Sequence, residues 1–363
     1  MKLVVSAGDP SGDVRAGELL RELNSIARVS VSGLGGDNLR RAGADILFHL
    51  DSYSVMGFAE VISSLGKLRK LRRDLRTHIL ESAPDAVLLV DYPGFNIPLA
   101  EWAADRGFRV IYYISPQLWA WGSGRVRRIR RSVDLMMTLF RFEVDFYEKR
   151  GVRAVWTGHP LADSIPAPLQ QGLTGKLALL PGSRRQEVSL LLEPMVEAFG
   201  ILRREGLVNR ATVAVTPGVP FEVYGNALAA EGVTTADSVK EALDGAASAV
   251  VCSGTATLET AMWGVPFIIA YRTSPLTYLL ARLLVRGVRN IGMANLVAGR
   301  QFAGELIQSQ VTPGAIAEGT RPLLKEGPAR RTALEGAVLV RKALGPPGSS
   351  ARAAELVVRE AGG

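Results

Sequence analysis

The sequence predicts an α/β protein made of two doubly wound domains that face each other across a cleft. Short apolar runs alternate with helical segments along the first half of the chain, and the alternation restarts beyond residue 175. Strands that alternate with helices imply parallel sheets covered by helices on both faces. The chain of 363 residues is long enough for two such domains. Functional side chains are therefore expected at the carboxyl ends of the strands.

The expected strands are short runs of mostly apolar residues. In the first half they are 2–7, 29–32, 87–90, 110–114, 133–139 and 155–157, and in the second half 177–180, 212–215, 249–252 and 266–270. An amphipathic helix follows the first strand as far as about Asn24, and a last helix is expected over 351–361. Prolines and small polar residues predict a linker over 160–175. The expected domains are thus 1–160 and 161–345, and the C-terminal segment 346–363 is a candidate to pack on the first.

The composition excludes several classes of protein. An apolar fraction of 47% with 21% charged residues is typical of a soluble globular chain. The single cysteine, Cys252, rules out an internal disulfide and suits a reducing compartment. None of the three histidines has a metal-like partner at short spacing, so we expect neither a metal nor a cofactor. No signal peptide and no membrane-spanning run is recognisable, so we expect a cytoplasmic protein unless it binds a membrane from the side.

The net charge of +8 indicates an anionic partner: nucleic acid, acidic lipid or a phosphorylated substrate. Two basic runs stand out, at 125–131 and in a leucine-containing helical stretch with Lys67, Arg69, Lys70, Arg72, Arg73 and Arg76. Such runs are usually solvated helix faces, but with this excess charge they could lie on anionic phospholipid. The apolar loop 53–58, which includes Met56, could contact acyl chains or belong to the core. No nucleic-acid-binding module is visible.

The stretch 247–269 favours a nucleotide site. A buried strand ends at Cys252, and a turn of small polar residues leads into a short helix that carries Glu259. Backbone N–H groups at such a helix start attract an anion, and a carboxylate there could hold a vicinal diol such as ribose. The alternative is that Thr255 merely caps the helix. A capping box would need Glu or Gln where Leu258 stands, which weakens that alternative.

A second corner of the same kind lies at 179–187. Ser183 and Gln186 have the spacing of a capping box, which is the structural alternative. Arg184 and Arg185, however, oppose the helix dipole, which prefers acidic residues in the first turn. Cations at a position where they cost stability favour a phosphate held by Arg184 and the helix N-terminus together.

In the first half, acidic residues follow two of the expected strands. Asp91 ends a buried strand, while Asp9, Ser11 and Asp13 follow the first strand and should converge on the same edge. One of these carboxylates could be a general base whose pKa depends on its burial, or all could serve in caps and loop networks. Familiar phosphate motifs are incomplete: Asn38 interrupts a GxGxxG pattern. A P-loop at Gly175-Lys176 lacks its first glycine, because Gln170 stands at that position.

Taken together, the motifs resemble those of the lipid-A-disaccharide synthase family, glycosyltransferases of the GT-B type with two Rossmann-like domains. The segments that carry the resemblance are AGDPSGD, GLGG, SVMGFAEV, VDYPGFN, ISPQLWAW, GHPLAD, LLPGSRRQEV, CSGTATLE and NLVAGRQFAGELIQ. They run through almost the whole chain in one order. That makes the resemblance far more specific than a single glycine pattern.

The resemblance implies transfer of 2,3-diacylglucosamine from UDP to 2,3-diacylglucosamine 1-phosphate, with inversion, at the cytoplasmic face of the inner membrane. The second domain would bind UDP through Ser183, Arg184, Ser253, Gly254, Thr255, Thr257, Glu259 and Asn295. The first domain would bind the acceptor, near Asp9, Ser11, Asp13, Met56 and Asn96. Asp91 would take the proton of the acceptor's 6-hydroxyl, and Arg184 would neutralise the leaving diphosphate. The partners would be these two substrates and an anionic membrane surface, without nucleic acid and with an oligomer left open.

The chain departs from the family pattern on the acceptor side. Asp9 stands where the opening motif usually has Glu, Gly122 stands where Arg usually follows the WAW motif, and 139–143 lacks the usual proline. Other enzymes of similar fold, namely a GT-B transferase with another acceptor or a UDP-sugar epimerase, remain alternatives. A nonenzymatic protein that binds acidic lipid or nucleic acid through its arginines is a third.

Overall fold

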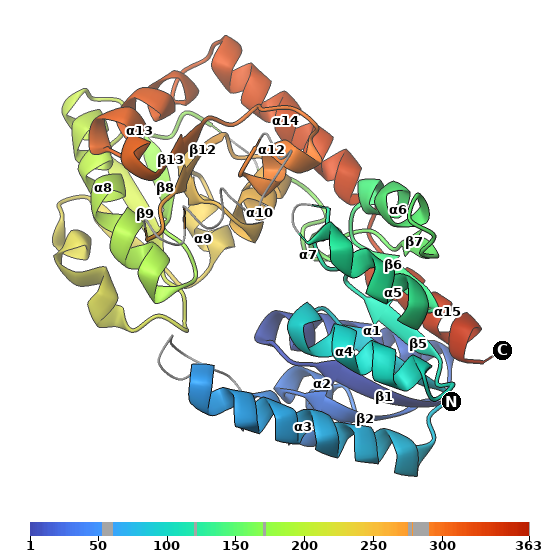
Figure 1. Ribbon diagram of the computed structural model, residues 1–363. Helices are drawn as coiled ribbons and strands as arrows, with labels where there is room; N and C mark the ends of the chain where they lie inside the picture. The colour runs from blue at the N-terminus through green and yellow to red at the C-terminus, as the bar shows by residue number, and fades with distance from the viewer. Residues whose placement is uncertain (53–60, 120–121, 170–171, 275–277, 279–289, 363) are drawn as a thin grey trace. The chain divides into compact units, whose positions relative to one another are not determined.

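The computed structural model describes residues 1–52, 61–119, 122–169, 172–274, 278 and 290–362 (Figure 1). The chain forms two compact units. Unit 1 comprises Met1–Asp163 and Pro346–Gly363, and unit 2 comprises Ser164–Gly345. The α/β class and the two parallel sheets expected from the sequence are confirmed.

Unit 1 is built on a parallel sheet with the strand order β3-β2-β1-β4-β5-β6-β7 among the described residues. Its strands are β1 (Lys2–Ala7), β2 (Ser30–Gly35), β3 (Asp45–His49), β4 (Ala86–Val90), β5 (Val110–Tyr113), β6 (Leu135–Thr138) and β7 (Ala154–Trp156). The order reverses between β1 and β4, where Ala7 lies opposite Val90. The segments that follow these two strands therefore start side by side, at the point where doubly wound sheets bind ligands.

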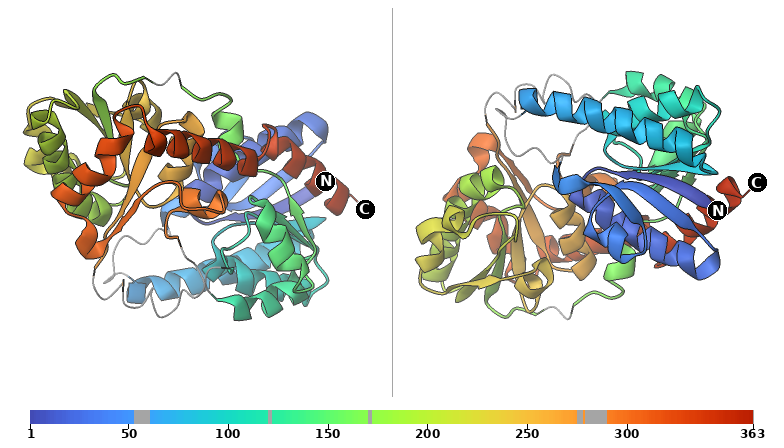
Figure 2. Two further views of the ribbon diagram at one scale, coloured as in Figure 1. Left: turned by 90° about the horizontal axis from the view of Figure 1, so that it is seen from above. Right: turned by 90° about the horizontal axis from the view of Figure 1, so that it is seen from below.

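Helices cover both faces of this sheet (Figure 2). They are α1 (Pro10–Ile26), α2 (Asp37–Arg41), α3 (Val61–Ser82), α4 (Pro93–Ala104), α5 (Val126–Ser132), α6 (Arg141–Glu148), α7 (Leu161–Ser164) and α15 (Ser349–Ala361), with 3-10 turns η1 (Leu50–Ser52) and η2 (Ser123–Arg125). One buried cluster joins the sheet to α1 and α15, and another joins it to α3, α4 and α5. The C-terminal helix thus lies in unit 1, where the buried Glu360 pairs with Arg109 and Arg153.

Unit 2 repeats the architecture with the strand order β10-β9-β8-β11-β12-β13 among the described residues. The strands are β8 (Lys176–Leu180), β9 (Arg210–Ala214), β10 (Val233–Ala236), β11 (Ser248–Cys252), β12 (Phe267–Tyr271) and β13 (Glu305–Ile307). The helices are α8 (Arg185–Arg204), α9 (Val239–Leu243), α10 (Thr255–Trp263), α12 (Met293–Val297), α13 (Pro313–Thr320) and α14 (Pro328–Leu344), with η3 (Phe221–Ala229), η4 (Gln308–Gln310) and η5 (Arg321–Leu323). Here the order reverses between β8 and β11, with Leu180 opposite Val251.

The strands missing from the sequence-based prediction are β3, β10 and β13. Each lies at an edge of its sheet or carries partly exposed residues, so it lacks the continuous apolar run of a central strand. The predicted linker also contains structure, since α7 begins at Leu161. No helix in the described part of the chain is long and apolar enough to cross a membrane.

Candidate active site

A pocket of about 440 Å³ opens in unit 2 at the carboxyl ends of the strands. Its walls come from the turns after four neighbouring strands, β8, β9, β10 and β11. Among its lining residues are Gly182, Ser183, Arg184, Thr216, Asp237, Ser238, Ser253, Gly254, Thr255 and Glu259. Two corners singled out in the sequence, which are about seventy residues apart, therefore contribute to one pocket, and most of their predicted nucleotide-binding residues face it.

The start of α10 presents backbone N–H groups to this pocket. The N-cap residue Gly254 has a φ of 149°, which favours glycine, and no side chain caps the helix among the described residues. The first N–H groups of a helix have no intrahelical acceptor, and the helix dipole adds to their attraction for an anion. Thr255 and Glu259 line the pocket on the same helix. The corner is thus suited to a phosphate with a diol nearby.

The start of α8 is arranged differently from the prediction. The N-cap is Arg184, and Glu187 Oε2 accepts hydrogen bonds from the backbone N–H groups of Ser183 (3.0 Å) and Arg184 (3.2 Å). The structural alternative weighed for this corner, a capping box of Ser183 with Gln186, is therefore displaced by one residue, to Arg184 with Glu187. Because a carboxylate already occupies these N–H groups, an anion here would be held by the Arg184 guanidinium, whose side chain is 81% exposed beside Glu187.

Two predicted nucleotide residues are buried and do not belong to the described lining of the pocket. Thr257 is buried, donates to Gly254 O at 2.7 Å and accepts from Ala294 N at 3.2 Å. Asn295 is also buried, and its side-chain amide is bonded to Phe302, Ala303 and Glu305. Neither belongs to the described lining of the pocket. Both hold neighbouring segments in register, which is the role the structure gives them.

Some polar residues of the pocket were not predicted from the sequence, among them Thr216, Asp237 and Ser238. Thr216 follows β9 and donates to Gly182 O at 3.2 Å, while Asp237 and Ser238 follow β10. The Pro-Gly turn after β9 was the available signal for Thr216. Asp237 and Ser238 had no such signal, because β10 itself was not recognised.

Asp91 in unit 1 has an unusual backbone. It follows β4, and both Asp91 (φ 44°) and Tyr92 (φ 48°) lie in the left-handed region that non-glycine residues rarely adopt. The carbonyl of Asp91 accepts hydrogen bonds from Tyr112 Oη (2.6 Å) and from Asn96 Nδ2 (2.8 Å). Strain of this kind persists only where surrounding contacts hold it, and it gathers at functional sites.

The carboxyl of Asp91 is also electrostatically perturbed. Burial and then the neighbouring charge of Asp9 raise its pKa from 3.8 to about 6, although the Tyr92 N–H lowers it. Asp9 itself is engaged: it is the N-cap of α1, and its Oδ1 accepts from Gly12 N (2.8 Å) and Ser11 Oγ (2.6 Å). The two acids therefore meet at one edge of the sheet, and Asp91 has the pKa suited to a general base.

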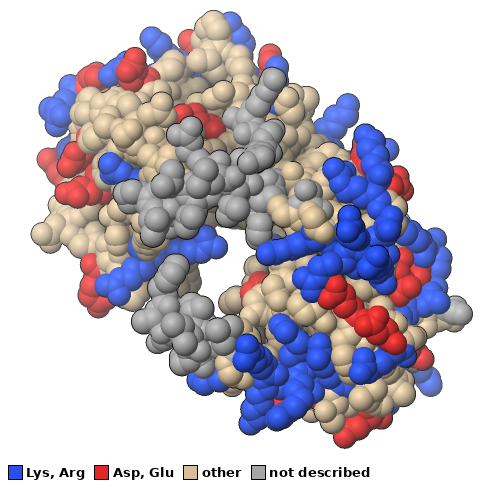
Figure 3. Space-filling view, in the orientation of Figure 1, with Lys and Arg blue, Asp and Glu red and all other residues tan. Residues whose placement is uncertain are grey.

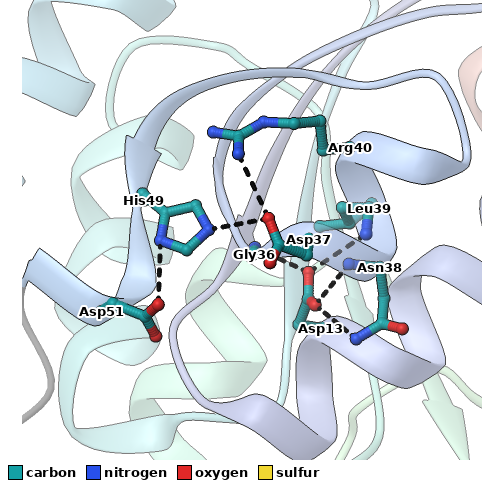
Figure 4. A network of polar contacts seen from close by, with 8 residues as sticks. All are labelled: Asp13, Gly36, Asp37, Asn38, Leu39, Arg40, His49 and Asp51. Atoms are coloured by element: carbon teal, nitrogen blue, oxygen red, sulfur yellow. Dashed lines mark hydrogen bonds and ion pairs between the residues drawn. The ribbon is translucent and has the colours of Figure 1, made fainter.

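Asp13 and Asn96 have structural roles. Asp13 is 2% exposed and accepts hydrogen bonds from the backbone N–H groups of Gly36, Asn38 and Leu39 and from the Asn38 amide (Figure 4). This is a complete set of partners for a carboxylate, so Asp13 anchors α2. Asn96 is fully buried, accepts from Ser6 Oγ, and positions the Asp91 backbone. Met56 lies outside the described residues.

Glu143 is a further buried acid of unit 1 that was not predicted as a site residue. Glu143 is 2% exposed and accepts from Trp119 Nε1 (3.0 Å) and Phe140 N (3.1 Å). Burial raises its pKa to about 7, although these hydrogen bonds lower it. These hydrogen bonds fasten the segment after β5 to the start of α6. Both segments belong to the motifs that depart from the family pattern, namely the WAW motif and residues 139–143.

The six cations predicted as one patch on α3 divide into two groups. Lys67, Arg69, Lys70 and Arg73 are exposed, and cationic side chains gather over this part of unit 1 (Figure 3). Arg72 and Arg76 are half-buried, with their guanidinium carbons 5.0 Å and 5.2 Å from the ring centres of Phe95 and Trp102 on α4. The second group packs the helix onto the unit. No group of metal-ligating side chains is found within the described ranges.

Two doubly wound units, each built on a parallel sheet, define the GT-B fold, and solved structures share it. The structure is similar over 99% of the chain to CalG4, the calicheamicin glycosyltransferase, with a TM-score of 0.65, 15% identity and 98% of that chain covered. It is likewise similar to Acinetobacter baumannii MurG, with a TM-score of 0.59, 16% identity and 99% of that chain covered. Methanocaldococcus jannaschii UDP-GlcNAc 2-epimerase shares the fold at a TM-score of 0.60 and 11% identity, with that chain covered in full (100%).

The family model described as Lipid-A-disaccharide synthetase matches residues 3–354. A lipid-A-disaccharide synthase of Myxococcus xanthus is 37% identical over 371 residues, which cover 98% of this chain and 97% of that protein. One from Coxiella burnetii is 34% identical over 333 residues, with 89% and 88% covered. The chain belongs to the lipid-A-disaccharide synthase family, and it is a glycosyltransferase.

Proposed function

We propose that the protein transfers 2,3-diacylglucosamine from UDP to the 6-hydroxyl of 2,3-diacylglucosamine 1-phosphate, with inversion, to form a β-1,6 disaccharide 1-phosphate and UDP. The observation that carries this proposal is the family match along residues 3–354. The two corners of the unit 2 pocket and the perturbed acid of unit 1 support it with chemistry that such a transfer needs.

UDP binds in the unit 2 pocket. The N-terminus of α10 holds a phosphate, Glu259 holds the ribose hydroxyls, and the exposed Arg184 guanidinium neutralises the diphosphate as it leaves. The accessibility of these groups in one pocket of about 440 Å³ supports the assignment. Thr257 acts behind them through its hydrogen bond to Gly254 O of the pocket wall, and Asn295 fastens α12 to residues 302–305.

Asp91 acts as the general base. The acceptor's 6-oxygen attacks the anomeric carbon, the bond from that carbon to the diphosphate breaks, and the hydroxyl proton passes to the Asp91 carboxylate. A pKa of about 6 leaves this carboxylate ionised at pH 7.5 and still a better base than an ordinary aspartate. Asp13 is not assigned as the base, because its oxygens already accept hydrogen bonds from backbone N–H groups. Asp9 is not assigned either, because it caps α1.

The exposed cations of α3 bind the anionic surface of the membrane that holds the acylated substrates. The protein then works as a peripheral enzyme at the cytoplasmic face of the inner membrane. Lys67, Arg69, Lys70 and Arg73 support this, since basic side chains near an anionic surface each add roughly 1 kcal/mol of attraction. Nucleic acid is not a partner in this proposal.

The decisive experiment is a mass-spectrometric assay with both acylated substrates. We expect a disaccharide from the wild-type protein and a rate at least about 100-fold lower from Asp91→Asn, because general-base catalysis contributes roughly 10²–10⁴-fold. The matched control is Asp105→Asn, which alters an exposed aspartate at the end of α4 and should leave the rate unchanged. UDP affinity should be equal in all three proteins.

Two results would contradict the proposal. Asp91→Asn turnover within twofold of wild type would remove Asp91 as the base. Release of UDP with other acceptors, but no disaccharide, would retain the nucleotide site and discard the acceptor.

A further inference from the structure

Unit 2 contains a second cavity on the other side of the α8 N-terminus. It has a volume of about 1130 Å³, against about 440 Å³ for the nucleotide pocket. Its described lining includes Arg185, Ser189 and Leu190 of α8, together with Arg272, Tyr278 and Gln308. The volume lies slightly above the roughly 300–1,000 Å³ of pockets that enclose a drug-sized ligand. None of the nucleotide residues proposed above lines it.

The two cavities meet at the first turn of one helix. Ser183, Arg184 and Glu187 line the nucleotide pocket, whereas Arg185 and Ser189 line the larger cavity. One helical turn advances only about 5.4 Å, so these residues lie within a sugar's length of one another. A ligand whose diphosphate is held beside Arg184 can therefore extend into the larger cavity without leaving unit 2.

The chemistry of the larger cavity suits an amphiphile. Carbon makes up most of its accessible wall, yet two arginines lie in it. Neither Arg185 nor Arg272 forms an ion pair with any residue in the described ranges. Arg185 also opens a helix, where a cation is disfavoured by the dipole. Carbon surface beside unpaired cations is complementary to acyl chains joined to an anionic head.

The side-chain amide of Gln308, in the wall of the larger cavity, has an unsatisfied hydrogen-bond donor among the described residues. Its backbone is left-handed, with a φ of 53°, and its Oε1 accepts from Thr273 N at 3.1 Å. Its Nε2 is buried without a hydrogen-bond partner among the described residues. An unsatisfied buried donor costs stability, so its retention in a cavity wall points to a ligand with carbonyl or hydroxyl acceptors.

We propose that this cavity receives the acyl chains of the donor sugar, so that unit 2 selects the acylated nucleotide sugar over its unacylated form. The inference rests on the proposed function, because it assumes that the diphosphate lies in the neighbouring pocket. Each methylene buried against carbon strengthens binding by about fourfold. Donor affinity therefore rises steeply with acyl-chain length until the cavity is filled.

The test fills the cavity by mutation. Ser189→Trp adds bulk from an exposed position in the lining, and Glu197→Trp is the matched control on an exposed position of the same helix outside it. Equilibrium dissociation constants are measured for UDP and for UDP-sugar donors with acyl chains of several lengths. Ser189→Met is a milder second variant if Ser189→Trp does not bind UDP and so has not folded.

We expect Ser189→Trp to weaken binding of the long-chain donor at least tenfold and to flatten the chain-length dependence, with UDP affinity within twofold of wild type. Glu197→Trp should behave as wild type in every measurement. Equal affinity of wild type for acylated and unacylated donors would overturn the inference, as would a Ser189→Trp protein that loses acceptor affinity and keeps donor affinity. Because these measurements are binding constants, they test the inference even if the wild-type protein forms no disaccharide. Absence of the disaccharide would overturn the proposed function and not this inference.

Discussion

At the scale of the residue, the ionised Asp91 carboxylate lowers the free energy of unfolding. Its carboxyl has a folded-state pKa of about 6 against an ordinary value of 3.8. A carboxyl with a raised pKa stabilises the fold only while protonated, so this stability is present below pH 3.8 and lost as the pH rises through about 6. At neutral pH the ionised group costs up to about 3 kcal/mol. Asp91→Asn should accordingly be at least about 100-fold slower and yet no less stable than wild type at neutral pH, which denaturant unfolding checks.

The pH dependence of turnover tests the coupling of Asp91 to Asp9. The base must be ionised, so kcat/KM should fall tenfold per pH unit below about 6 and level off above it. Asp9→Asn removes the second largest cause of the raised pKa while keeping an N-cap side chain, so the acid limb should move to lower pH. The measurement is the pH profile of kcat/KM. An unmoved acid limb in Asp9→Asn would show that Asp9 does not act on the base.

Tyr112 is expected to position the base without touching substrate. Its hydroxyl donates at 2.6 Å to the strained Asp91 carbonyl, so Tyr112→Phe should lower kcat about tenfold with KM changed less than threefold. Tyr147→Phe removes an equivalent bond, from Tyr147 Oη to Pro116 O at 2.7 Å, and is the control. Both variants should lose about 1 kcal/mol of unfolding free energy, measured in denaturant. A purely structural role for Tyr112 would make the two variants equal in kcat.

At the scale of elements, the proposed nucleotide contacts lie at helix termini. Arg184→Ala should weaken UDP binding about tenfold to hundredfold, the usual worth of a charge-assisted contact. Stability should hardly change, because the pair with Glu187 is at the surface and Arg184 is 81% exposed. The control is Arg204→Ala at the other end of α8. Calorimetric titration with UDP checks both, and unchanged affinity in Arg184→Ala would refute its contact with phosphate.

Helix α3 separates a packing role from a surface role. Replacement of Lys67, Arg69, Lys70 and Arg73 by Ala should lower binding to anionic vesicles at least tenfold, in a salt-dependent manner, without a change in Tm. Arg72→Ala and Arg76→Ala should instead lower Tm, since these side chains cover Phe95 and Trp102.

The matched control for α3 is a second set of four exposed arginines in unit 1, Arg21, Arg28, Arg40 and Arg41, replaced by Ala. It changes the net charge by the same amount at other positions. Equal loss of vesicle binding in the two sets would mean that total charge, and not α3, drives attachment.

For the whole molecule, the alternation of strands and helices was sufficient to predict two parallel sheets. Central strands such as β4 and β11 are buried on both faces and appear as unbroken apolar runs. Edge strands such as β10 have no such run, because one side faces solvent. The same reasoning located the carboxyl edges of the two sheets, where Ser253, Arg184 and Asp91 follow their strands.

Which polar residue at such an edge is available to a ligand was decided only by tertiary structure. Asp13 and Asp91 both follow strands of one sheet, but Asp13 is occupied by N–H groups of residues 36–39. Asn295 is similarly bound to residues 302–305. Sequence alone determined the class, the motifs and the edge at which they gather, because these follow from local periodicity. The partner of each side chain depends on segments distant along the chain, and only their packing selects it.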